Sequence, residues 1–189
     1  MNLQRTIKNN AVVEGLGVFS GAPCLLRFCP APEDTGIVFV RTDTITPVEI
    51  PADVEYLSHR PHRTTSLTKD NVSVETIEHV MAAVSGMGID NIIIEVNSDE
   101  MPSTDGSPLP FVNALQQAGT EEQDIEEFVY VIDEPIIVSE DEAMVTALPG
   151  PADFLEILYD LEYEMPSIGR QIMGFRLGKD DFATQLAPA

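Results

Sequence analysis

The chain has 189 residues, 43% of them apolar, and carries a formal net charge of −22 at pH 7. This length allows one large or two small domains with a sizeable core, and no apolar run reaches the roughly 18 to 20 residues that cross a bilayer. The negative charge excludes nucleic acid as an expected partner, because phosphates would be repelled, and the absence of an apolar leader at the start favours a cytoplasmic protein.

The first third of the chain predicts short strands joined by turns. A glycine-rich turn at residues 15–21 is followed by a strand and not by a helix, so it predicts a hairpin and not a dinucleotide site. Cys24 and Cys29 fall in the returning strand and are interpreted as small strand residues. The predicted strands are residues 6–15, 24–30, 37–41 and a shorter edge piece at 48–52, which proline ends.

Residues 59–67 are polar and irregular, with two histidines and two arginines among five consecutive residues. Such a concentration of basic groups in an acidic chain suits a phosphate-bearing substrate, with arginine as a bidentate partner. The alternative interpretation is an exposed connecting loop.

The stretch from 72 to 88 predicts an amphipathic helix. Ser73 is the expected N-cap, and two glycines end the helix. A second helical face is small apart from Glu75 and His79. The expected buried face consists of Ile77, Val80, Met81, Val84 and Met87.

Glu78 and His79 are the candidate chemical pair on this helix. Successive helical residues diverge by about 100°, but the two side chains can still converge on one spot as a base and a metal ligand. The alternative is an ordinary structural or surface histidine. One histidine alone does not make a zinc site, because a catalytic zinc takes about three protein ligands.

The first domain is completed by a strand at 92–96 and a helix at 109–118, which Gly119 stops. Strands and two helices in this order predict an α+β unit with its helices on one sheet face. The acidic run 121–127 is interpreted as a boundary, which gives a first domain at 1–125 and a second at 126–189. Expected second-domain strands are 128–132, 136–138, 144–148 and 154–159, with a helix opening at 182–186.

The motifs together resemble the zinc-dependent UDP-3-O-acyl-N-acetylglucosamine deacetylase family, LpxC, of lipid A biosynthesis. The order and spacing hold from the start to about Val112 and more thinly beyond it. The matching pieces are Gln4-Arg5-Thr6, Gly15-x-Gly17-x-x-x-Gly21, Pro30-Ala31-Pro32-x-x-Thr35-Gly36, Arg41-Thr42-Asp43, Pro51-Ala52, Thr76-Ile77-Glu78-His79, Gly88-Ile89-Asp90-Asn91, Glu100-x-Pro102-x-x-Asp105-Gly106-Ser107 and Phe111-Val112.

The resemblance implies two similar sheet-plus-helices domains, of the ribosomal S5 domain 2-like type, with the second incomplete here. It implies Glu78 as general base and His79 as a zinc ligand, with Arg63 and Thr64 as neighbours of a UDP-sugar lipid substrate. No transmembrane segment is expected, and transient contact of the longer protein with a membrane surface stays open.

Two departures from the family pattern bear on activity. Phe19 stands where the family usually has histidine in the glycine turn. The family's remaining zinc ligands come from a His-Lys-x-x-Asp motif, and a further histidine protonates the leaving amine; this chain has no histidine after His79. We therefore expect these ligands beyond Ala189, in a longer protein of which this chain is the front part. Alone, the chain is expected to bind zinc weakly and not to turn over substrate.

Two alternatives remain open from the sequence. A non-catalytic binding or relic module would keep the fold without the zinc site, and a longer reading frame lacking His-Lys-x-x-Asp would favour it. The second alternative is a small acidic interaction domain in which the Glu-His pair is incidental.

Overall fold

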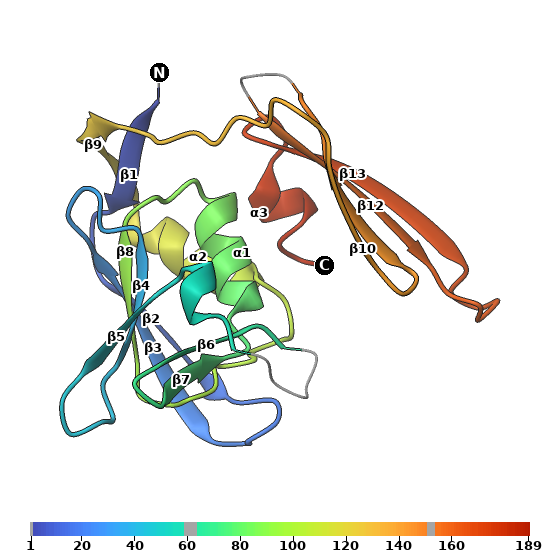
Figure 1. Cartoon of the computed structure of the whole chain (residues 1–189). Coiled ribbons are helices and arrows are strands. Elements are labelled where there is room, and N and C mark those ends of the chain that lie inside the picture. Colours follow the sequence, from blue (N-terminus) through green and yellow to red (C-terminus); the bar gives the residue numbers. More distant parts are fainter. Residues whose placement is uncertain (1, 59–63, 151–153) are drawn as a thin grey trace. The chain divides into compact units, whose positions relative to one another are not determined.

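The computed structural model describes residues 2–58, 64–150 and 154–189 (Figure 1). The chain divides into two compact units. The first contains the residues up to Glu127 together with Ala183–Ala189, and the second is Phe128–Phe182. The elements mix sheets with a few helices, so the predicted α+β class is confirmed.

A mixed five-stranded sheet forms the centre of the first unit, in the order β2-β3-β8-β4-β5. Strands β4 and β8 are parallel, and the other neighbours are antiparallel. The predicted hairpin around the glycine turn and the edge position of β5 are confirmed. The strands are β2 (Ala11–Leu16), β3 (Pro23–Pro30), β4 (Ile37–Arg41), β5 (Val48–Pro51) and β8 (Ile92–Val96).

Two helices, α1 (Glu78–Gly86) and α2 (Leu109–Ala118), lie on the same side of this sheet (Figure 1). Alternate strand residues turn toward them, and the Phe28 ring meets Phe111 of α2 edge-on at 6.5 Å. Helix α2 has the predicted bounds and ends at Gly119, whose φ of 70° favours glycine. The fully buried sheet side chains are Leu26, Phe28, Phe39, Ile50, Ile92, Ile94 and Val96.

The expectation of one strand over residues 6–15 is wrong. The chain instead forms β1 (Leu3–Ile7) and then β2, with a bend between them. The Lys8 amide donates to the carbonyl of Gly119, and the Asn9 side chain donates to the carbonyl of Ala118. The first bond continues the β1–β9 register by one residue, and both bonds hold the bend between β1 and β2 against the end of α2.

The acidic run forms strand β9 (Thr120–Glu126), which pairs antiparallel with β1 and so belongs to the first unit. Most of its side chains are exposed, which suits carboxylates on an outer strand. A small hairpin of β6 (Ser66–Lys69) and β7 (Val72–Glu75) and a 3₁₀ turn, η1 (Val54–Tyr56), complete this unit.

The second unit contains two antiparallel hairpins. The first joins β10 (Ile136–Glu140) to β11 (Ala143–Ala147), and the second joins β12 (Leu155–Glu162) to β13 (Arg170–Leu177). Residues 128–132 are not in a strand, contrary to the expectation, and β13 was not predicted. The predicted helical start is confirmed as α3 (Phe182–Gln185).

One face of the β12–β13 hairpin is apolar, because Leu155, Ile157 and Tyr159 pair with apolar residues across the ladder. Phe182 packs edge-on against Phe175 on this unit, with 6.1 Å between ring centres. Ile157 is nevertheless 45% exposed and Tyr159 is 61% exposed. The hairpin face thus keeps exposed apolar side chains. Among the described residues, no helix has the length and apolarity to cross a membrane.

Candidate active site

The Glu78-His79 pair lies at an abrupt turn from a strand into a helix. Strand β7 ends at Glu75, Thr76 adopts a φ of +59°, and α1 begins at Glu78. A positive φ at a β-branched residue is strained, and such strain concentrates at functional sites. The turn places both side chains in the first helical turn.

The expected helix start at Ser73 is wrong. Ser73 lies in β7, paired with Thr68 of β6, and Ile77 caps the helix without a side-chain hydrogen bond. Glu75 is therefore a strand residue and does not share a helical face with His79. Ala83 is fully buried, so the face expected to be open is packed at that position.

The Glu78 carboxylate is oriented by the main chain of Thr65. The Thr65 amide donates to Oε2 of Glu78 at 3.1 Å, and the Thr65 carbonyl accepts from the Ile77 amide at 3.3 Å. Thr65 could not be recognised from the sequence, because a main-chain contact leaves no residue-type signal. Oε1 of Glu78 has no hydrogen-bond partner among the described residues.

His79 is half-buried beside it. No hydrogen bond within the described part of the chain engages its imidazole, a group that commonly ligates metals. Thr64, half-buried, precedes the Thr65 peptide that contacts Glu78 and so lies near the pair. Arg63 and the rest of the basic cluster at 59–63 lie outside the described residues.

An open groove of about 490 Å³ lies against Glu78, within the volume range of small-molecule sites. Glu78, Met81, Ala82 and Ser85 recur at helical spacing along its α1 side. Across the groove lie apolar side chains around η1, including Leu57, which is 50% exposed. The groove places apolar surface next to a carboxylate.

The residues of this site fit one position of a zinc centre and do not complete it. His79 offers a suitable nitrogen, but the described residues contain no cluster of three histidine, cysteine or acidic side chains able to hold a metal. The cysteines do not supply the missing ligands. Cys24 is buried in β3, where burial raises the pKa of its thiol to about 12.

Arg41, the last residue of β4, stabilises the strand β7 that leads into the site. Its guanidinium, 8% exposed, donates to both oxygens of Asp43 at 2.9 and 2.7 Å and to the carbonyl of Ser73 in β7. It thereby joins the central sheet to the strand that leads into Glu78.

The hydrogen bonds from Arg41 lower the pKa of Asp43 below its ordinary value of 3.8. A depressed folded-state pKa stabilises the protein above the unfolded pKa, and this stabilisation is lost as the pH falls through the folded value. Asp43→Asn is expected to lower the free energy of unfolding at pH 7 by about 1 kcal/mol, since water screens a partly exposed carboxylate. Urea unfolding at pH 7 and pH 3 measures this; an equal loss at both would contradict the assignment.

Comparison with known proteins shows the family to which the chain belongs. Residues 4–189 match the family model LpxC, UDP-3-O-acyl N-acetylglycosamine deacetylase. The chain is 40% identical to the UDP-3-O-acyl-N-acetylglucosamine deacetylase of Myxococcus xanthus, over 98% of this chain and 58% of the relative. It is 36% identical to that of Bdellovibrio bacteriovorus, over 100% and 62%. It is 39% identical to a bifunctional LpxC/FabZ enzyme of Chlorobaculum tepidum, over 98% and 39%.

The chain that gives these matches is an α+β protein with a carboxylate and an imidazole at the start of one helix. The chain belongs to the LpxC family of UDP-3-O-acyl-N-acetylglucosamine deacetylases. It spans about three-fifths of the length of the deacetylases quoted above.

Proposed function

We propose that the protein containing this chain is a zinc-dependent hydrolase that removes acetate from UDP-3-O-acyl-N-acetylglucosamine in lipid A biosynthesis. The observation that carries the proposal is the placement of Glu78 and His79 at the strand-to-helix turn, with Glu78 lining an open groove, in a chain of this family. Arg63 and Thr64 are proposed substrate neighbours, and the protein is proposed to act in the cytoplasm.

Glu78 is the proposed general base. The Thr65 amide holds Oε2, which leaves Oε1 to take the proton of the attacking water. His79 is the proposed zinc ligand, with the remaining ligands beyond Ala189. Zinc, when bound, supplies an acidified water and polarises the amide carbonyl. Cleavage of the amide then gives acetate and a free amine, whose proton donor is also expected outside these 189 residues.

Deacetylation of the UDP-sugar lipid by the gene product read to its stop codon tests this function directly. The 189-residue chain assayed beside it is expected to release no acetate, because it holds only part of the proposed ligand set. Acetate release by the short chain would show that the remaining ligands are not needed. A longer product without activity would overturn the deacetylase proposal.

Zinc content provides a second, separate test. The longer product is expected to hold about one zinc per chain and to lose it on His79→Ala, because removal of one of about three protein ligands weakens a catalytic site strongly. The 189-residue chain is expected to retain little zinc after dialysis. Retention of zinc by the His79→Ala variant would contradict the ligand assignment.

The alternative is a binding or relic module that keeps the fold without a metal. A longer reading frame without a His-Lys-x-x-Asp motif would favour it. If the longer product holds no zinc, this alternative replaces the enzyme.

A further inference from the structure

Glu100 is a buried carboxylate for which the proposed reaction has no use. The residue is 3% exposed and follows β8 in a loop. Its Oε1 accepts from the amide of Phe19 at 2.9 Å, and its Oε2 accepts from the amide of Ser20 at 2.8 Å. A buried carboxylate is tolerated only when hydrogen bonds replace its hydration.

These hydrogen bonds keep the carboxylate charged. Burial opposes the charge, but donors from the Ser20 hydroxyl and from the amides of Phe19, Ser20 and Val18 lower the pKa of Glu100 overall. Three successive amides directed at one carboxylate form an anion-binding nest. The main chain of the glycine turn thus surrounds the carboxylate of Glu100.

Gly17 permits this approach. A Cβ built on Gly17 would lie 2.2 Å from Oε2 of Glu100 and 2.3 Å from the Ser20 hydroxyl, distances that no side chain can occupy. The requirement for glycine at this position therefore comes from the Glu100 carboxylate itself.

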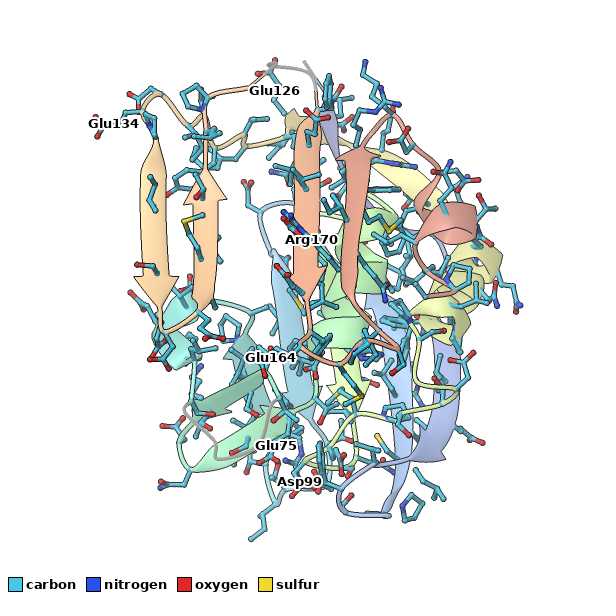
Figure 2. All side chains as sticks on the ribbon, turned by 90° about the vertical axis from the view of Figure 1, so that its right-hand side faces the viewer. Glu75, Asp99, Glu126, Glu134, Glu164 and Arg170 are labelled. Carbon is cyan, nitrogen blue, oxygen red and sulfur yellow. The ribbon has the colours of Figure 1, made fainter. Side chains whose placement is uncertain are left out.

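The main chain beside Glu100 contacts a different part of the site. Glu75, the last residue of β7, forms a parallel bridge with Glu100. The Glu75 amide donates to the carbonyl of Asp99 at 2.7 Å, and the Glu75 carbonyl accepts from the amide of Met101 at 3.0 Å. Figure 2 shows Glu75 and Asp99 close together at the same end of the first unit. Only Thr76 and Ile77 separate this bridge from Glu78.

We propose that Glu100 is a positioning residue: its carboxylate holds the glycine turn, and the main chain of its two neighbours, Asp99 and Met101, holds Glu75 at the entry to α1. The turn that carries Phe19, which is 60% exposed, is thereby fixed relative to Glu78 and His79. Glu100 touches no reacting atom; it acts through the two segments it joins. The consequence for catalysis rests on the proposed function, whereas the mechanical link does not.

Amide hydrogen exchange on the 189-residue chain tests the link. Glu100→Gln keeps the size of the side chain but replaces one acceptor oxygen by a donor. Exchange is expected to accelerate by about tenfold or more at Phe19 and Ser20 and also at Glu75. The amide of Ile92, bound to the carbonyl of Gly36, is the internal reference and is expected to be unchanged. The matched control is Glu95→Gln on β8, whose carboxylate forms an exposed ion pair with Arg27.

The outcomes separate the possibilities. Faster exchange at the turn with no change at Glu75 would show that Glu100 holds only the turn. An equally large increase in the exchange rate of Ile92 would show a general loss of stability. Either result overturns the proposal. In the longer product, Glu100→Gln is expected to lower kcat by about tenfold with KM changed less than about threefold. An unchanged kcat would overturn the catalytic consequence. If the unsubstituted product is inactive, the proposed function fails and the exchange result still decides the link.

Discussion

If the longer gene product is the deacetylase proposed above, replacement of Glu78 by glutamine is expected to lower its kcat by about 10²- to 10⁴-fold, the range that a general base contributes. The amide has nearly the size of the carboxylate and can still accept a hydrogen bond from the Thr65 amide, so the helix start should persist. It cannot take a proton, so the attacking water loses its base. Steady-state rates at saturating substrate measure the effect, since KM is expected to change little.

Glu55→Gln is the matched control for this experiment. Glu55 lies in η1, on an element that contributes to the same groove, but its side chain is exposed and it is not part of the strand-to-helix turn. The same chemical change there is expected to leave kcat within about twofold, as for most surface substitutions. A Glu78→Gln variant as active as the Glu55→Gln variant would remove Glu78 from the proposed mechanism.

Strands and helices with a single consistent pattern could be predicted from the sequence. Helix α2 has proline near its start, an apolar face including Phe111 and a glycine at its end, and all three signals agree. The hairpin of β2 and β3 was predictable for the same reason, because the glycine turn separates two runs of strand-forming residues. In these places, local preference and tertiary packing favour the same structure.

The start of α1 could not be predicted, because residues 72–75 satisfy two patterns. Val72 and Val74 alternate as in a strand, but Val74 also lies three residues before Ile77 and so extends the helical spacing. Pairing with β6 across a two-residue turn and the bridge to Glu100 decide for the strand. Glu100 is distant in the sequence, so its contribution could not be recognised there. The sequence proposes the pair Glu78-His79 by residue type and by resemblance to a family, whereas the contacts of Thr65 and Glu100 are visible only in the fold.

The acidic strand β9 could not be recognised from its sequence for a different reason. Its composition is typical of a solvated boundary, and carboxylates disfavour strands. Pairing with β1 supplies the hydrogen bonds, and the exposed outer position leaves the charged side chains in water. Strand β13 was missed because Gly174 interrupts its apolar run, although the ladder with β12 continues through that residue.

The core of the first unit makes the largest stability prediction. Phe28 is fully buried at the centre of β3 and meets the edge of Phe111, so it joins the sheet to α2. Phe28→Ala is expected to lower the free energy of unfolding of the first unit by about 3 to 5 kcal/mol, from lost burial and the cavity left behind. Urea unfolding followed by the amide signals of β8 reports on this unit separately from the β10–β13 hairpins.

Phe19→Ala removes the same number of atoms from an exposed ring and keeps the amide that Glu100 binds. Its cost in free energy of unfolding is expected to stay within about 0.5 kcal/mol.

The double substitution of Phe28 and Phe111 by alanine should cost less than the sum of the two single changes, by about 0.5 to 1.5 kcal/mol, because the rings contact each other. Additive losses would mean that α2 is held to the sheet by its other buried side chains, Val112 and Leu115 among them, and that the edge-on ring contact contributes nothing beyond the area it buries.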